Sequence, residues 1–473
     1  MDSKKKTNFT GSLGFVLAAA GSAVGVGNIW RFPYLAARDG GGLFLIIYII
    51  LAFTFGFVLL TTDIVIGRKT EKNAWQAFGS INKNWGFLGK LTFLVPAIIM
   101  TYYSVIGGWI LKYSATYVIG KGNDAALDGY FTSFITSKVA PIVFMLIFLA
   151  ITAYIVFWGV EDGIEKFSRV IMPILFVTII GISIYSLSIK HTDENGVTRT
   201  GLQGLAIYMI PNFEGVTLSK FLGIVLDAMT QLFFSLSISM GIMITYGSYV
   251  KKDVDLNKSI AQIELFDTGV AFLAGVMIIP SIFVFAGKEG MQSGPSLMFI
   301  SLPKVFESMG AFGNVIGIAF FLMVLFAALT SSVSIMETLV ANLMNIFHTS
   351  RKKTSITVAV IAAATSIIIC LGYNIFYFEC DLPNGATNQQ LLDIVDYISN
   401  NFLMPIISLL TCIFIGWVVK PKWVAQEMTV GAEKFKREGL YSVMIKYVAP
   451  VVMAVLFLQS TGILTFIINL ISK

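Results

Sequence analysis

Eleven long runs of apolar residues constrain this 473-residue chain more than any other feature of its sequence. The runs cover roughly residues 12–37, 43–66, 88–117, 139–158, 168–189, 219–249, 259–286, 311–341, 355–376, 395–419 and 442–470. Each run reaches the ~20 residues that a helix needs to cross a bilayer, and backbone groups in hydrocarbon must find partners within their own segment. The sequence therefore predicts an all-α, polytopic membrane protein with eleven transmembrane helices.

The charge content excludes several other classes of protein. Charged residues make up 13 % of the chain and hydrophobic residues 56 %, whereas a soluble domain carries about 25 % charged residues. A soluble enzyme, a disordered chain and a nucleic-acid binder are excluded, despite the net charge of +6. The three cysteines, Cys370, Cys380 and Cys412, fall at uneven spacings, so no disulfide framework or zinc site follows from them.

Basic residues indicate the orientation, because Lys and Arg gather on the cytoplasmic side of a membrane protein. With the N-terminus inside, that side collects about two-thirds of all Lys and Arg, including those at 4–6 and 351–353. We expect the inner (plasma) membrane, a cytoplasmic N-terminus and, from the odd number of spans, a C-terminus outside. No Pro-, Gly- or Ser-rich linker divides the chain, so residues 1–473 are expected to form one transmembrane domain.

Two of the runs contain interruptions that a simple membrane anchor lacks. In the first run, Gly21, Gly25 and Gly27 fall close together and are followed by Asn28. Glycines weaken a helix and free its carbonyl groups, although helix–helix packing through small residues also explains such a pattern. In the sixth run, over 233–241, three serines alternate with apolar residues. Paired interruptions in equivalent positions of two five-helix halves are typical of an inverted-repeat transporter with its site at the membrane midplane.

Polar residues elsewhere in the runs indicate what such a site binds. The eighth run contains Thr-Ser-Ser at 330–332, which is more hydroxyl groups than helix packing requires. The acids within the runs include Asp63, Asp267 and Glu337, which are functional candidates because acids are costly in lipid. Hydroxyl, carbonyl, amide and carboxylate oxygens suit alkali cations rather than zinc or copper. No Ser–His pair, Cys/His cluster or phosphate-cradling loop supports an enzyme, so enzymatic activity is not expected.

Several of these stretches resemble the neurotransmitter:sodium symporter family. The matching stretches are Gly21 to Tyr34, Gly40-Gly41-Gly42, Tyr102-Tyr103, Gln231 to Ser237, Thr245 to Tyr249 and Thr330-Ser331-Ser332. They follow the family's order along nearly the whole chain, which is similar to the shorter, eleven-helix bacterial amino-acid transporters. The resemblance implies inverted five-helix repeats at about 9–190 and 218–419, an extra helix at about 442–470, and helices 1 and 6 unwound at the midplane.

The resemblance also implies two sodium sites and one substrate site. The first sodium site would use Ala23, Asn28, Ser235 and Asp267. The second would use Gly21, Val24, Ala327, Thr330 and Ser331. The substrate would meet Ala23, Gly25, Ile99, Tyr103, Phe234, Ser235, Ser237, Ser239, Met240, Ser331 and Ile335. In this arrangement Tyr103 and the amide of Gly25 hold the substrate carboxylate, and the hydroxyl of Ser237 faces its ammonium group.

Gates on the two sides of the substrate follow from the same resemblance. Arg31 and Asp396 would form the outer gate, closed by Tyr103 and Phe234, and Tyr249 would belong to the inner gate. The Arg–Asp pair of the family's inner gate appears here as Lys6 and Asn345, which do not carry opposite charges. The family's second-helix Glu, which braces the unwound segments, is Asp63, one methylene shorter.

The implied function is a sodium-coupled symporter that imports hydrophobic L-amino acids by alternating access. Gly25 stands where monoamine carriers have an Asp, so the substrate must supply its own carboxylate. Met240 replaces a Phe of the family's leucine carrier and can yield room for an aromatic ring, whereas Ser239 narrows the pocket floor. A different small amino acid, and a substrate-gated sensor or channel of the same fold, are the alternatives.

Sodium is expected to act without chloride. Tyr48, Gln231 and Ser235 match three chloride ligands of animal members, but the fourth position is Ala271. Asp267 would supply the negative charge from the protein instead. The expected partners are therefore an amino acid, sodium ions and membrane lipid, with no nucleic acid; the sequence does not specify the exact amino acid, the sodium stoichiometry or the oligomeric state.

Overall fold

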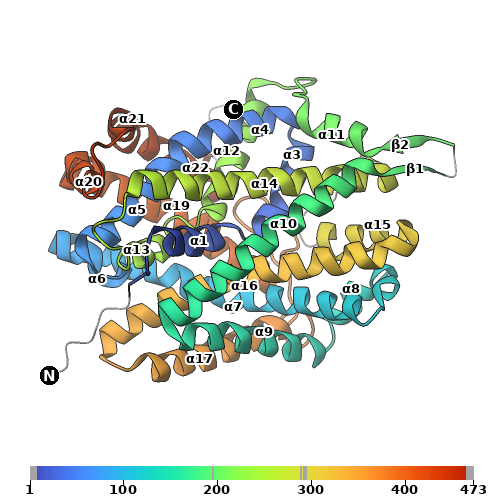
Figure 1. Ribbon diagram of the computed structural model, residues 1–473, viewed down its shortest axis with the longest axis horizontal. Coiled ribbons are helices and arrows are strands. Elements are labelled where there is room, and N and C mark those ends of the chain that lie inside the picture. Colours follow the sequence, from blue (N-terminus) through green and yellow to red (C-terminus); the bar gives the residue numbers. More distant parts are fainter. Residues whose placement is uncertain (1–7, 194–195, 288–289, 291–295, 465–473) are drawn as a thin grey trace.

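The structure, a computed structural model, describes residues 8–193, 196–287, 290 and 296–464. In this part of the chain, ten helical stretches are long and apolar enough to cross a membrane, and a bent pair in the first run makes an eleventh. The prediction of eleven spans is confirmed (Figure 1). In chain order the spanning elements are α1 (Ser12–Ala23), α2 (Val26–Ile29) and α3 (Arg31–Arg38); α4 (Gly42–Leu51), η1 (Ala52–Gly56) and α5 (Phe57–Thr70); α7 (Gly86–Val118); α9 (Ala140–Phe157); η4 (Val160–Glu165) and α10 (Lys166–Ser188); α12 (Leu218–Ser235) and α13 (Ile242–Gly247); α14 (Leu256–Ala286); α16 (Gly313–Phe347); α17 (Arg351–Leu371); α18 (Leu391–Asp396), η8 (Tyr397–Leu403), α19 (Met404–Ile413) and η9 (Phe414–Val419); and α21 (Glu438–Val443), η10 (Met444–Val448) and α22 (Ala449–Ser460).

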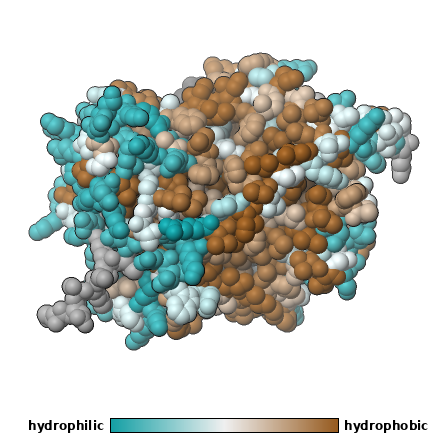
Figure 2. Space-filling view, in the orientation of Figure 1, coloured by the Kyte–Doolittle hydropathy of each residue, from teal (hydrophilic) through white to brown (hydrophobic). Residues whose placement is uncertain are grey.

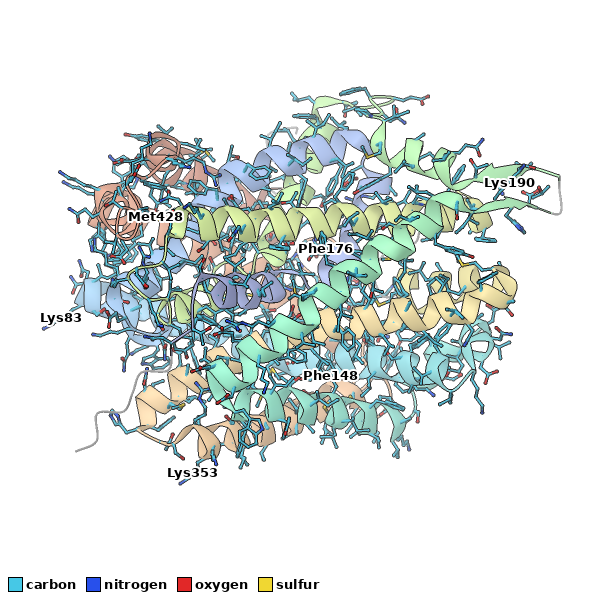
Figure 3. The ribbon with its side chains drawn as sticks, in the orientation of Figure 1. Lys83, Phe148, Phe176, Lys190, Lys353 and Met428 are labelled. Atoms are coloured by element: carbon cyan, nitrogen blue, oxygen red, sulfur yellow. The ribbon has the colours of Figure 1, made fainter. Side chains whose placement is uncertain are left out.

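An apolar belt crosses the visible face of the bundle. Figure 2 shows hydrophobic side chains over the middle of the molecule and hydrophilic ones gathered at its two ends. Lys83 and Lys353 lie at one end, Lys190 lies at the other, and Phe148 and Phe176 lie between them (Figure 3). We call these two ends the Lys83 end and the Lys190 end. The belt and the spans together identify a multi-pass membrane protein.

The connections between spans carry more regular structure than the hydrophobic pattern predicts. At the Lys190 end, β1 (Lys190–Thr192) and β2 (Thr198–Thr200) pair as an antiparallel hairpin that leads into α11 (Gly201–Met209). Thr200 and Gln203 cap this helix by exchanging side-chain to backbone hydrogen bonds. The remaining short elements are α6 (Ala74–Ile81), η2 (Lys83–Trp85), η3 (Gly122–Ala126), α8 (Tyr130–Ile135), η6 (Leu297–Ser301), α15 (Leu302–Ser308), η7 (Gly310–Phe312) and α20 (Pro421–Met428).

The first span lies at the centre of the bundle. Helix α1 packs against α10, α14 and α16, and α16 in turn packs along α7. Nearly all of α1 is buried, and its apolar residues face neighbours on every side, as expected for a helix without an amphipathic face. The polar groups that α1 presents between Gly14 and Ala23 are therefore shielded from lipid and water by the surrounding helices.

Candidate functional site

The first span is broken where the glycines predict it. Helix α1 ends at Ala23, α2 begins at Val26, and the two parts of the span are bent by 61°. A Cβ atom on Gly25 would lie 3.0 Å from the hydroxyl oxygen of Ser331 and 3.5 Å from that of Tyr103. The glycine therefore lets its backbone approach both hydroxyl groups.

The sixth span is also broken, between Ser235 and Ile242. Ser237 and Ser239 have φ angles of +52° and +62°, a left-handed conformation that costs a residue with a Cβ roughly 1–2 kcal/mol. Hydrogen bonds hold both residues in place. The Ser237 hydroxyl donates to the carbonyl of Ser22 at 3.1 Å, and the Ser239 amide donates to the carboxylate of Asp63 at 3.0 Å.

A cavity lies where the two breaks meet α7 and α16. Its wall consists of Ser22, Ala23, Gly25, Asn28, Ile99, Tyr103, Phe234, Ser237, Met240, Ile242, Ser331 and Ile335. This wall includes every predicted substrate residue except Ser235 and Ser239. The cavity volume is about 20 Å³, and of the two expected gate residues in its wall Tyr103 is buried and Phe234 is partly buried.

The sequence missed two wall residues, and two of the predicted substrate residues, Ser235 and Ser239, lie outside the wall. Ser22 lies within the first predicted interruption and Ile242 lies one residue beyond the second, so their positions in the sequence were a signal for both. The expectation that Ser239 narrows the pocket floor is wrong in this structure, because its hydroxyl turns to the hydroxyl of Ser408 on α19. Ser235 instead donates to Asp267 at 2.7 Å.

Asp267 on α14 gathers the residues predicted for the first sodium site. Its Oδ1 accepts hydrogen bonds from the Asn28 amide at 2.8 Å and from the Ser235 hydroxyl at 2.7 Å. Its Oδ2 is buried and has no hydrogen-bond partner, and the same holds for Tyr48 Oη and Gln231 Oε1. Buried polar atoms are normally satisfied, so the bare carboxylate oxygen marks a place where a cation would be stabilised.

The residues predicted for the second sodium site also lie together. The Ser331 hydroxyl donates to the carbonyls of Ser22 at 3.1 Å and Gly21 at 3.5 Å. The Thr330 hydroxyl donates to the carbonyl of Ala327 at 3.0 Å, and a Cβ on Gly21 would lie 3.3 Å from Thr330 Cβ. Val24 has left the helix, with ψ of 86°. These carbonyl and hydroxyl oxygens form a neutral set of hard ligands.

The predicted outer gate is not closed by a direct contact. Within the described part of the chain, Arg31 forms no hydrogen bond or ion pair with Asp396. The Asp396 carboxylate instead accepts a hydrogen bond from Asn400 at 2.6 Å. Arg38, which the sequence did not single out, pairs with Asp39 at 2.7 Å and with the carboxylate of Asp227 on α12.

A buried ion pair lies toward the Lys83 end. Tyr249 donates to Glu337 Oε1 at 2.8 Å, and Arg351 contacts both carboxylate oxygens of Glu337 at 2.5 Å and 2.8 Å. The sequence identified Tyr249 and Glu337 separately but missed Arg351, which begins the next span at the same end. Of the expected pair, Lys6 lies outside the described residues and Asn345 is exposed.

Comparisons with known proteins fit this architecture. Residues 6–120 and 134–467 match the family described as the sodium:neurotransmitter symporter family. The uncharacterized sodium-dependent transporter YhdH of Bacillus subtilis (strain 168) is 33 % identical over 98 % of this chain and 100 % of its own. An uncharacterized sodium-dependent transporter of Haemophilus influenzae is 30 % identical over 97 % of this chain and 99 % of its own. The crystal structure of MhsT in complex with L-phenylalanine aligns with a TM-score of 0.83 and 33 % identity, over 96 % of this chain and 100 % of that chain.

Proposed function

This chain belongs to the sodium:neurotransmitter symporter family and is a sodium-dependent transporter, not an enzyme; on that premise, we propose that it imports hydrophobic L-amino acids, aromatic ones included. One observation carries the proposal. The wall of the cavity at the two helix breaks is divided between residues that offer hydroxyl, amide or backbone groups and residues with apolar side chains, and it contains no charged residue. A zwitterion with an apolar side chain matches that division.

The polar side of the cavity would hold the amino-acid backbone. Tyr103 Oη is buried without a hydrogen-bond partner, which supports a role as donor to the substrate carboxylate together with the amide of Gly25. The carbonyls of Ala23, Phe234 and Ser235, with the Ser237 hydroxyl, would face the ammonium group near the ends of the half-helices.

The apolar side would hold the substrate side chain. Ile99, Met240, Ile242 and Ile335 line it, and methionine is flexible enough to adapt to rings and branched chains. The complex of MhsT with L-phenylalanine supports an aromatic substrate in a related protein.

Two sodium ions would bind beside this cavity. The first would meet Ala23, Asn28, Ser235, Asp267 and the substrate carboxylate, which is the shared ligand that couples the two solutes. Because sodium and substrate raise each other's affinity by the same factor, sodium would favour binding of the substrate and closure of the site around it. The second would meet the carbonyls of Gly21, Val24 and Ala327 with the hydroxyls of Thr330 and Ser331.

Chloride would not be required. The ionised Asp267 would supply the charge that balances the first sodium, and Ala271 at the neighbouring position offers no hydroxyl to a chloride ion.

Alternating access would move the cavity between the two ends of the bundle. We assign the Lys83 end to the cytoplasm, because basic residues such as Lys83 and Lys353 gather there (Figure 3). Tyr397, early in the tenth span, donates to the carbonyl of Ser460 at 2.8 Å, so α22 ends toward the Lys190 end. This supports a C-terminus outside the cell. Arg31 and Asp396 would close the outer side, and Tyr249 with Glu337 would close the inner side.

A thermal-shift screen of the twenty amino acids, with and without sodium, tests the proposal. A ligand that binds only the folded state stabilises it by mass action. We expect hydrophobic and aromatic L-amino acids to raise the melting temperature only when sodium is present. Stabilisation by a monoamine, with no response to any hydrophobic amino acid, would contradict the proposed substrate class.

A further inference from the structure

The break between α12 and α13 adopts a backbone conformation that its residues disfavour. Ser237 and Ser239 have positive φ angles of +52° and +62°, and Gly241 follows at +73°. Residues with a Cβ avoid this region, and they remain there only when the surrounding structure fixes them. The contacts of this segment therefore show what determines its shape.

Ser239 is fixed by contacts with two other helices, neither of which contributes a residue to the cavity wall. Its amide donates to Asp63 Oδ2 on α5 at 3.0 Å, and its hydroxyl pairs with the Ser408 hydroxyl on α19. All three residues are buried. Neither Ser239 nor Ser408 belongs to the cavity wall, so the hydroxyl pair serves the backbone of the break rather than the substrate.

The next residue, Met240, does line the cavity. On the C-terminal side of Met240, the carbonyl of Gly241 accepts hydrogen bonds from the Thr245 amide at 3.0 Å and from the Thr245 hydroxyl at 2.8 Å. A Cβ on Gly241 would come within 2.9 Å of Ala74 Cβ, so the backbone is packed tightly there. Met240 is thus held between two anchored residues, and its backbone cannot withdraw unless Ser239 is released.

We propose that Ser239 and Ser408, with Asp63, are positioning residues that set the depth of the side-chain pocket through Met240. The hydroxyl pair holds Met240 against the cavity and so limits the size of the amino-acid side chain that the transporter accepts. This inference rests on the proposed function, because it assumes an amino-acid substrate. Loss of the pair lets the segment move back toward α19, and larger side chains gain affinity relative to smaller ones.

Selectivity among substrates of different size tests this inference. Sodium-dependent binding of L-leucine and L-tryptophan is measured on the purified full chain, for the unmodified protein and for Ser408→Ala and Ser239→Gly. Glycine accepts the positive φ angle, so Ser239→Gly removes the hydroxyl without adding backbone strain. We expect the tryptophan-to-leucine affinity ratio to rise about tenfold in each variant, the change typical of one lost buried hydrogen bond. The double variant should match the single ones, because both remove the same interaction.

Two control variants separate this role from a general loss of stability. Ser186→Ala removes a buried hydroxyl pair with Ser281, at 2.9 Å between α10 and α14, away from the cavity wall, and should leave the ratio unchanged. Ser408→Thr keeps the hydroxyl and should keep the ratio of the unmodified protein. An unchanged ratio in both Ser408→Ala and Ser239→Gly, with binding retained, overturns this inference alone. Failure of the unmodified protein to bind any amino acid in sodium overturns the proposed function together with it.

Discussion

The side-chain amide of Asn28 donates a hydrogen bond of 2.8 Å to Asp267 Oδ1 and so joins the broken first span to α14. Ser235 donates to the same oxygen at 2.7 Å, so three spans meet at one carboxylate. Asp267 is fully buried, yet its Oδ2 has no hydrogen-bond partner. A buried carboxylate with one bare oxygen is unfavourable until a cation reaches it, which is why the proposed sodium coupling centres on this residue.

Removal of this charge should weaken sodium binding. We expect Asp267→Asn to lower sodium affinity by about 100-fold or more, the scale of an uncompensated buried ion. Added chloride should rescue the variant poorly, because Ala271 offers no ligand. The measurement is the sodium concentration that half-saturates amino-acid binding. Asp227→Asn is the matched control, since Asp227 lies outside the cavity wall and pairs with Arg38; an equal loss in both variants would count against the assignment.

The hydroxyls of Thr330 and Ser331 should act as sodium ligands rather than as packing groups. Thr330→Val preserves volume and should weaken the sodium activation of uptake about 10- to 100-fold, because a bond to a charged group contributes about 1.5–3 kcal/mol. Ser331→Ala should act in the same direction. Sodium titrations of uptake give the result, and unchanged curves for both variants would mean that the second site lies elsewhere.

Arg31 should be needed for transport more than for binding. It has no direct ion-pair partner in the described part of the chain, which leaves it free to engage Asp396 when the outer side closes. We expect Arg31→Ala to retain equilibrium binding of the substrate but to lose uptake. Arg38→Ala removes a half-exposed arginine at the same end, where ion pairs contribute little, and should transport normally. Full uptake by Arg31→Ala would exclude it from the gate.

The Glu337–Arg351 pair should stabilise the fold toward the Lys83 end. Glu337 is fully buried and Arg351 is largely so. Because breaking a buried pair typically costs about 3–5 kcal/mol, Glu337→Gln should lower the melting temperature of the purified protein. Replacing both members together should restore part of the loss. If Glu337→Gln melts at the temperature of the unmodified protein, the pair does not support the closed inner side.

Hydrophobic runs, the glycines of the first run and the alternating serines of the sixth run were sufficient to predict the spans and both breaks, because bilayer crossing and helix weakening depend on local sequence. The partners of the polar residues could not be predicted in this way. The Ser239 hydroxyl pairs with Ser408, which lies 169 residues away in the sequence. The residues around Ser239 do not indicate that its hydroxyl points away from the pocket toward that partner. The sequence identified Glu337 as an acid that is costly in lipid. Its ion pair with Arg351 could not be predicted, because it depends on how the eighth and ninth spans pack against each other.

The outer gate shows a second limit on what can be predicted from the sequence. Arg31 and Asp396 carry complementary charges at one end of the bundle, and the resemblance pairs them. In the structure Asn400 holds the carboxylate instead. Such a pairing depends on the conformation of the transporter, which charge alone does not specify.

Uptake of labelled L-phenylalanine into proteoliposomes tests the central claim, sodium-coupled amino-acid transport, most directly. We expect phenylalanine to accumulate above its external concentration when sodium is present outside only. Accumulation should vanish when potassium replaces sodium and should remain when gluconate replaces chloride. Uptake that merely equilibrates, and does so equally well without sodium, would contradict the account.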